Sequence, residues 1–193
     1  MEFTEACKKI ADLRLIQSSS GNLSQRSVFD SNEFYITCSG SWFEEISQEQ
    51  IITCSLKTKK STKLDSLIPS TELPMHVGIL ESRKDVNVVL HYQPVYGTII
   101  ACASKHIKNF NVIPEIPYYI GKIDYVPYYK PGSGLLSESV SKAIAQCNLV
   151  VMENHGLVVV GANFYQVIQR AIFFELACEI IVKSRSKLKF IEL

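Results

Sequence analysis

The chain has 193 residues, of which 47% are hydrophobic and 20% are charged, the composition of an ordinary globular protein that buries a real core. The formal net charge of +1 leaves no electrostatic basis for binding nucleic acid or an acidic membrane. We therefore expect one domain over residues 1–193, with neither nucleic acid nor membrane as a partner.

The six cysteines are scattered and form no CxxC pair, which argues against a zinc site made of thiolates. The first residues, MEFTEACKK, are polar and do not form a secretion signal. The most apolar late segment carries Arg170, Glu175 and Glu179, so it does not predict a membrane-spanning helix. We expect free thiols and a cytoplasmic location.

Hydrophobic periodicity predicts alternating short elements in the first part of the chain. An amphipathic helix is expected at its start, with Thr4 as a possible cap, and SSSGNLSQRS is interpreted as a polar loop. The further predicted elements are a strand over 34–37, a helical turn over 42–46, and a hairpin with strands over 51–55 and 64–68.

The second part continues the alternation, with a buried strand that ends at His91 and a long last helix that Asn163 caps. Another predicted helix has Ser137 as its cap. The predicted helices cover 72–82, 94–104 and 137–147, and the predicted strands cover 85–90, 112–116, 122–126, 149–152 and 157–160. This order is typical of a layered α/β domain, but it does not define the strand topology.

Two of the four histidines lie where predicted strands end, a common position for a metal ligand. His91 follows a β-branched strand, and His155 lies in the turn between two further strands. Neutral imidazole suits zinc and other cations of intermediate softness. The two rings either converge on one cation or merely end their strands, and position alone does not decide between these alternatives.

Three separate turns contain small polar residues that could bind a phosphate through backbone N–H groups and hydroxyls. Each turn by itself is better explained by helix caps and turn chemistry. The third turn also begins a predicted helix, whose dipole favours an anion. The residues are Ser19, Ser20, Gly21 and Asn22 in the first turn, Ser39 and Gly40 in the second, and Ser70 and Thr71 in the third.

Glu72 directly follows the third turn, where a carboxylate usually interacts with the helix dipole. If a metal site and an anion site meet there, Glu72 becomes a candidate general base. His76, four residues later, would share its helix face and is interpreted as a packing or supporting residue. His106 lies in a polar turn and is interpreted as a solvated side chain.

Together these pieces resemble the class II aldolase/adducin family over almost the whole chain. The family shows a Gly-Asn-x-Ser loop, an Ile-Thr-x-Ser/Thr-Gly turn, a Pro-Ser-Ser-Glu turn, a strand that ends in His-x-His, and a later Asn-His-Gly. The chain matches these motifs in order at Gly21-Asn22-Leu23-Ser24, Ile36-Thr37-Cys38-Ser39-Gly40, Pro69-Ser70-Thr71-Glu72, in part at His91-Tyr92-Gln93, and at Asn154-His155-Gly156.

The resemblance implies an α/β/α domain around a central mixed, largely antiparallel sheet. It also implies an aldolase that cleaves a small phosphorylated ketose through a metal-stabilised enediolate, in a homotetramer with its site at the subunit interface. A divalent metal, most often Zn²⁺ (with Mn²⁺ or Co²⁺ possible), would be held by His91, His155 and the residue at position 93. Ser19, Gly21, Asn22, Ser39, Gly40, Ser70 and Thr71 would hold the substrate phosphate.

The resemblance also implies a role for Glu72 in moving the proton beside the metal-bound carbonyl. It implies that a tyrosine of the neighbouring subunit donates a proton, and the stretch IPYYIG suggests Tyr118, with Tyr119 as the alternative. The sugar-phosphate aldolases carry a longer C-terminal tail with another tyrosine. We expect that tail to be missing here, because the chain ends at KFIEL.

Gln93 stands where the family has its third histidine, and a neutral amide oxygen is a weaker zinc ligand than imidazole. Three interpretations follow. The metal stays, with help from Gln93 or Glu72 and lower affinity or a different ion. The site binds a phosphorylated sugar or similar ligand without catalysis, since adducin shows that the family fold can survive without the metal site. The chemistry changes within the family, toward decarboxylation, dehydration or epimerisation.

Overall fold

Eight strands form one sheet in the computed structural model, which describes residues 1–62, 67–184 and 188–192. The strand order is β4-β3-β2-β1-β5-β8-β7-β6, and every neighbouring pair is antiparallel except β6 and β7. This confirms the expected mixed, largely antiparallel sheet. The strands are β1 (Asn22–Arg26), β2 (Glu33–Thr37), β3 (Ile51–Ser55), β4 (Lys60–Ser61), β5 (Val88–Tyr92), β6 (Ile123–Val126), β7 (Leu149–Met152) and β8 (Gly156–Gly161).

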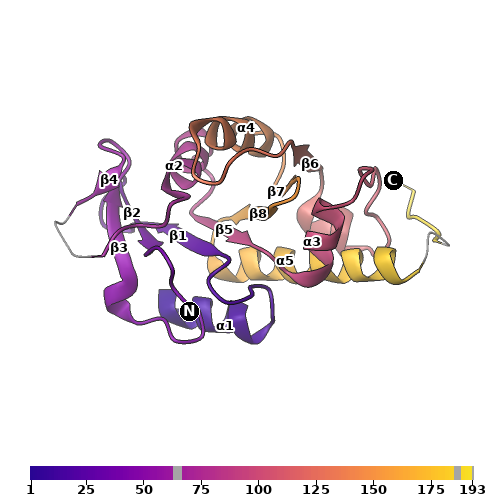
Figure 1. Cartoon of the computed structure of the whole chain (residues 1–193), viewed down its shortest axis with the longest axis horizontal. Coiled ribbons are helices and arrows are strands. Elements are labelled where there is room, and N and C mark those ends of the chain that lie inside the picture. The colour runs from indigo at the N-terminus through magenta and orange to yellow at the C-terminus, as the bar shows by residue number, and fades with distance from the viewer. Residues whose placement is uncertain (63–66, 185–187, 193) are drawn as a thin grey trace.

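Helices cover both faces of this sheet, with α1 and α5 on one side and α2 and α4 on the other (Figure 1). Each side has its own cluster of buried apolar side chains, so the molecule is a three-layered α/β/α structure. The helices are α1 (Phe3–Asp12), α2 (Leu73–Ser82), α3 (Val95–Ala101), α4 (Gly134–Ile144) and α5 (Phe164–Lys183), with short turns η1 (Gln48–Gln50) and η2 (Ile116–Ile120).

Strand β5 lies in the middle of the sheet, and its side chains alternate between the two cores. Leu90 and Tyr92 pack into the cluster beneath α5, whereas Val89 packs into the cluster beneath α2. His91 alternates with Leu90 and Tyr92, so its ring lies on the α2 face, and all five residues of the strand are buried. The buried run VVLHY therefore places a polar ring at the strand end, under the start of α2.

Strand β1 lies within the segment SSSGNLSQRS, for which the sequence predicts a loop, so this prediction is wrong. Its residues 22–26 instead pair with both β2 and β5 at the centre of the sheet. Leu23 is its only large apolar residue, so the periodicity of hydrophobic side chains gave too weak a signal. Tertiary partners for the buried Asn22 and Ser24 allow this polar segment to be a strand.

Several predicted boundaries were also wrong. Residues 112–115 lead into the π-helix η2, which begins at Ile116, and no strand forms over 112–116. Residues 42–46 form a turn without a helix. The cap of α4 is Ser133, whose hydroxyl accepts from the backbone N–H of Leu136. The N-cap of α1 is Glu2, in place of the predicted Thr4.

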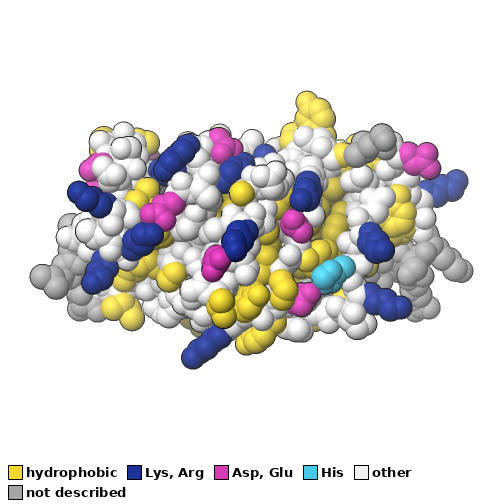
Figure 2. All heavy atoms as spheres, turned by 90° about the horizontal axis from the view of Figure 1, so that it is seen from above, with side chains coloured by type: hydrophobic (Ala, Val, Ile, Leu, Met, Phe, Trp, Pro, Cys, Tyr) yellow, Lys and Arg dark blue, Asp and Glu magenta, His cyan; other side chains and the backbone are white. Residues whose placement is uncertain are grey.

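The predicted hairpin after β2 forms, but its returning strand β4 begins earlier than expected, at Lys60. Residues 64–66 of the predicted strand lie outside the described residues. Over the α2 and α4 face, the basic and acidic side chains of the described residues are interspersed (Figure 2). Among the described residues, no helix is long and apolar enough to cross a bilayer.

Candidate active site

The candidate site is built where β1 and β5 run side by side. Asn22 pairs with His91 in the register of the two strands, so the Gly-Asn-x-Ser turn and the first histidine share one sheet edge. A Cβ on Gly21 would lie 2.8 Å from the carbonyl oxygen of His91. Only glycine lets the turn approach the strand so closely, which explains the residue type at position 21.

His76 of α2 lies over this edge and connects two residues of β1. One ring nitrogen, Nε2, is 2.5 Å from Oδ1 of Asn22, and the other, Nδ1, is 2.6 Å from the Ser24 hydroxyl. Since Oδ1 can only accept, Nε2 carries the proton and Nδ1 accepts from Ser24. Burial lowers the pKa of His76 from 6.5 to about 3, with the nearby His91 adding to the effect, so the ring is neutral. The interpretation of His76 as a supporting residue agrees with these contacts.

His91 and His155 do converge. Their ring centroids are 4.8 Å apart, in an edge-to-face arrangement. The Nδ1–H of His91 donates to the carbonyl of Leu157 at 2.9 Å, which leaves the lone pair on Nε2 free for a ligand. Burial, followed by the proximity of His155, lowers the pKa of His91 to about 3. Neutral imidazole is the form that binds a metal.

His155 follows Asn154, whose φ of 51° lies in the left-handed region that forms the tight turn between β7 and β8. Its pKa is lowered by burial, so this ring is also neutral. Its Nδ1 is buried and has no hydrogen-bond partner among the described residues. An unpartnered buried nitrogen is costly, so this ring is poised to bind something that the polypeptide does not supply.

Glu72 brings a carboxylate to the two rings. It is 4% exposed, and its Oε1 lies 3.9 Å from Nε2 of His155. The same oxygen accepts the backbone N–H of Gly132 at 3.1 Å. Burial raises the pKa of Glu72, and the bond from Gly132 opposes that rise. A raised pKa makes a carboxylate a stronger base and a better proton carrier than an exposed one.

Gln93 lies beside the same rings. A Cβ built on Gly156 would lie 2.7 Å from Cγ of Gln93 and 3.3 Å from Cε1 of His91. The side chains of Gln93 and His91 therefore both lie next to Gly156, the residue that follows His155. This position suits a ligand contributed by residue 93, although the group present is an amide.

The donor set fits a divalent cation. Two neutral imidazoles, one of them with an orphaned buried nitrogen, stand beside an amide and a carboxylate. Within residues 1–62, 67–184 and 188–192, no group of three His, Cys, Asp or Glu side chains is arranged to hold a metal ion. Gln93 is thus the residue that would have to complete a three-ligand set.

The second and third polar turns are tied together next to this site. The Ser39 N–H donates to the carbonyl of Ile68 at 2.9 Å, and the Ser70 N–H donates to the carbonyl of Thr37 at 3.1 Å. Thr37 in turn accepts the N–H of Leu23 through its hydroxyl at 3.3 Å. These bonds join the second and third turns to the start of β1, which directly follows the first turn.

The same bonds narrow the choice of phosphate ligands. The N–H groups of Ser39 and Ser70 are already engaged, and the Ser70 hydroxyl accepts from the N–H of Glu72 at 3.2 Å. Gly40 and Thr71 are exposed, and a φ of +75° at Gly40 favours glycine. Ser19 is exposed in its turn, and no contact places it against the other two turns.

Tyr118 lies on the surface, and no contact joins it to Glu72, His91 or His155 among the described residues. It lies in η2 and is 80% exposed, with its ring edge-to-face on Tyr119 at 4.7 Å. Tyr119 stacks on Phe173 of α5 at 5.3 Å and is less exposed. Of the two, Tyr118 is therefore the one free to reach another molecule.

Sequence reasoning missed Gly132. It precedes α4 and its N–H is bonded to the Glu72 carboxylate. Its φ is +73°, and a Cβ there would lie 3.0 Å from the Thr71 carbonyl oxygen. The dipeptide Pro131-Gly132 is a turn signal that could have marked a special backbone conformation, but nothing in the sequence connected it with Glu72.

Comparison with known proteins identifies a protein family that matches this chain. Residues 1–182 match the family described as Class II Aldolase and Adducin N-terminal domain. The L-fuculose phosphate aldolase of Methanococcus maripaludis is 32% identical over 162 residues, which are 84% of each chain.

Two further proteins that are similar to this chain carry names other than aldolase alone. The 3-oxo-tetronate 4-phosphate decarboxylase of Haemophilus influenzae is 30% identical over 146 residues, which are 74% of this chain and 67% of the relative. The crystal structure of YgbL from Klebsiella pneumoniae has a TM-score of 0.88 at 18% identity, and the match covers 98% of this chain and 91% of that one. The last similarity supports the fold.

Proposed function

Because the chain belongs to the class II aldolase and adducin family, we propose that it is a metal-dependent aldolase. It would cleave a small phosphorylated ketose into an aldehyde and a three-carbon phosphate. The observation that carries this proposal is the buried carboxylate of Glu72, 3.9 Å from His155, whose ring lies against that of His91. A protein that served only as a scaffold would have no physical need to bury these three groups together.

His91 through Nε2, His155, and the amide oxygen of Gln93 would hold a divalent cation, most often Zn²⁺ in this family. When bound, the cation would supply Lewis-acid stabilisation of the negative charge that develops on the substrate oxygens. The hydrogen bond from His91 to Leu157 keeps that ring in its tautomer and orientation. The chain's own residues would carry out proton transfer and bind the phosphate.

Glu72 would move the proton at the carbon next to the substrate carbonyl. Burial raises its pKa above that of an ordinary glutamate, which makes the carboxylate a stronger base for this proton transfer. The Gly132 N–H holds one carboxylate oxygen, so the proton transfers take place at a fixed position. Positioning of this kind contributes to catalysis because it removes the entropy cost of aligning the reacting groups.

The substrate phosphate would lie on the joined turns, against the open N–H of Gly40, the Thr71 backbone and hydroxyl, and the amide of Asn22. His76 binds Oδ1 of Asn22, which leaves the two Nδ2 hydrogens available for an anion. Gly21, Ser39 and Ser70 would set the conformation of the three turns. Ser19, in the first turn, would lie at the outer edge of the phosphate site.

Tyr118 would act as the proton donor from a neighbouring subunit of a homotetramer, with Tyr119 as the alternative. Mixing two inactive variants tests this arrangement. Glu72→Gln and Tyr118→Phe chains, unfolded and refolded together, should recover activity that neither has alone, because hybrid interfaces contain one intact site. Recovery with Tyr119→Phe instead would assign the role to Tyr119, and a monomer by light scattering would contradict a role across an interface.

Decarboxylation is the second candidate, favoured by the 30% identity to the Haemophilus influenzae decarboxylase. When a 3-oxo acid phosphate loses CO₂, the bond between the carboxylate carbon and C2 breaks, and its electron pair converts the C3 ketone into an enolate or enediolate that then takes up a proton. The same carboxylate and cation would serve both reactions. The two functions therefore differ in substrate while sharing the site.

A substrate panel separates the candidates. Phosphorylated ketoses and 3-oxo acid phosphates are incubated with the protein and added Zn²⁺, Mn²⁺ or Co²⁺, and aldehyde and CO₂ are measured. Aldehyde release that Glu72→Gln abolishes supports the aldolase, and CO₂ release supports the decarboxylase. Protein purified without a nickel column that binds none of these metals, and turns over no substrate, would contradict both and support a non-catalytic binding protein.

A further inference from the structure

A polar cavity lies at the far end of β1 and α2 from the candidate active site. Its volume is about 940 Å³, at the upper end of the range for small-molecule sites. β1 begins at Asn22 in the candidate site and ends at Arg26 in the wall of this cavity. Four residues of strand span about 13 Å. The cavity is therefore separate from the residues to which a function has been assigned.

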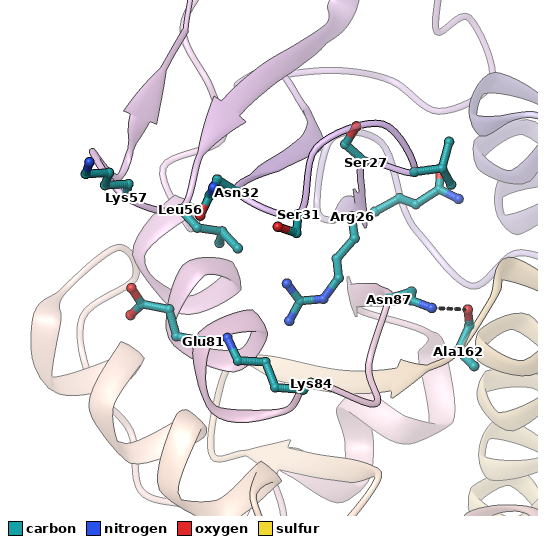
Figure 3. A pocket seen from close by; sticks show the side chains of 12 residues that line it. Arg26, Ser27, Ser31, Asn32, Leu56, Lys57, Glu81, Lys84, Asn87 and Ala162 are labelled. Atoms are coloured by element: carbon teal, nitrogen blue, oxygen red, sulfur yellow. Dashed lines mark hydrogen bonds between the residues drawn. The ribbon is translucent and has the colours of Figure 1, made fainter.

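Arg26 is the central charge of the cavity (Figure 3). Its guanidinium extends into the space between Ser31, Leu56 and Lys84. Nε donates to the carbonyl of Val86 at 2.8 Å, and Nη2 donates to the carbonyls of Leu80 and Arg83. No carboxylate of a described residue forms an ion pair with it.

These three bonds account for only part of the hydrogen-bonding capacity and charge of Arg26. They satisfy carbonyls at the end of α2 and in the loop after it, which is a structural role. Nη1 donates to no described residue, and the positive charge is balanced by neutral carbonyls alone. The guanidinium of Arg26 therefore has N–H donors and a net positive charge that are available to a ligand in the cavity.

The other charged groups of the lining add to the positive charge of Arg26. Lys84 lines the opposite wall and Lys57 lies at the rim, and neither forms an ion pair with a described residue. The one acidic residue of the lining, Glu81, is paired with Lys59 at 2.9 Å. The lining therefore carries a positive excess from Arg26, Lys57 and Lys84.

The neutral polar groups of the lining suit a ligand with hydroxyls. Asn87 donates through Nδ2 to the carbonyl of Ala162 at 3.2 Å, which leaves Oδ1 as an acceptor (Figure 3). Asn32 and Ser31 stand on the facing turn. We propose that this cavity binds a small organic phosphate, with the phosphate on Arg26 and Lys84 and the hydroxylated part against these amides and hydroxyls.

Nuclear magnetic resonance tests the proposal, because it reports the two sites separately. The ¹⁵N-labelled protein is titrated with glycerol 3-phosphate at a fixed ionic strength of about 0.15 M, where long-range attraction is screened. We expect saturable shifts at the Arg26 Nε–H, at the Lys84 amide and at the Asn87 side chain. Shifts at Gly40 and Thr71 report the proposed active site, so the failure of either site is visible without the other.

Charge reversal provides the matched control. The double variant Lys57→Glu, Lys84→Glu should weaken binding at the cavity by at least about tenfold, because attraction becomes repulsion. Lys8→Glu with Lys105→Glu makes the same change in net charge on exposed residues elsewhere and should leave the affinity unaltered. Both lysines of the cavity variant are exposed, so the fold should survive, which the dispersion of the spectrum checks.

Three outcomes would overturn the proposal. Shifts that do not saturate, or that are equal in both double variants, would show only unspecific attraction. Equal binding of glycerol would show that the phosphate is not recognised. Tighter binding of malate than of glycerol 3-phosphate would assign the site to carboxylates.

Discussion

His91 and His76 carry their protons on nitrogens that neighbouring oxygens select. The Leu157 carbonyl holds the proton on Nδ1 of His91, and the Asn22 amide holds it on Nε2 of His76. Both rings are buried and neutral. As a result, one histidine presents a lone pair to the candidate site, and the other fixes the Asn22 amide that we propose binds the substrate phosphate. The same residue type therefore has different roles, which depend on its partners.

Gln93→His should raise the affinity for zinc by at least about tenfold, because imidazole is a better zinc ligand than a neutral amide. Position 93 already lies against Gly156 and next to His91, so the new ring needs little rearrangement. Isothermal titration of metal-free protein measures the affinity. Gln146→His, at an exposed position beyond α4, should leave it unchanged. An unaltered affinity in Gln93→His would mean that residue 93 does not face the metal.

Gly132→Ala should reduce both stability and turnover. The φ of +73° strains a residue with a side chain, and the new Cβ would press on the Thr71 carbonyl. We expect a loss of about 1–3 kcal/mol of unfolding free energy, measured by urea denaturation. Gly134→Ala is the matched control, because nothing lies within 4 Å of its Cβ and it begins α4. If both variants behave alike, Gly132 does not position Glu72.

At the scale of elements, the ends of helices decide where the site residues lie. α2 starts directly after Glu72 and carries His76 one turn later, so one helix presents both the proposed base and the support of Asn22. α4 lies against α2, and the Ser137 hydroxyl donates to the Pro74 carbonyl at 2.7 Å. The loop with Gly132 leads into α4, and therefore the start of α4 affects the position of Glu72.

Ser133→Ala should destabilise the protein by about 1 kcal/mol, since the Ser133 hydroxyl caps α4 through the Leu136 N–H at 3.2 Å. Thermal or urea unfolding measures the change. Ser139→Ala, inside the same helix, should be neutral or slightly stabilising, because alanine has the higher helix propensity. A larger loss for Ser139→Ala would contradict the assignment of the cap.

For the whole molecule, the buried neutral histidines link folding to pH. The unfolded chain protonates His76 below its ordinary pKa of 6.5, whereas the folded protein resists protonation until about pH 3. The unfolded state thus binds more protons in this window, and stability is fully present above pH 6.5 and falls as the pH decreases.

His76 alone should contribute a slope of about 1.4 kcal/mol per pH unit below that value. Denaturation of metal-free protein at pH 7, 6 and 5 would show it. His76→Gln should flatten the dependence by that amount, whatever its effect at pH 7. An equal slope in both proteins would mean that His76 titrates normally in the folded state.

Much of the molecule was readable from the sequence. Strands 51–55 and 149–152 and the Asn163 cap of α5 were predicted correctly, because dense β-branched runs and a capping side chain act locally. The resemblance to the family predicted the layered fold, which the structure and the comparisons confirm. The assigned roles of the site residues stay predictions.

What the sequence determined by itself was therefore local: the order of most elements, and the residue types that suit a cation, a proton and a phosphate. The tertiary structure decided which of them meet. Strand β1 exists because β2, β5 and His76 satisfy its buried polar groups, and no local pattern contains those partners. Likewise, Gly132 reaches Glu72 from 60 residues away. Contacts between distant segments depend on how the layers pack, and one-dimensional periodicity carries no record of that packing.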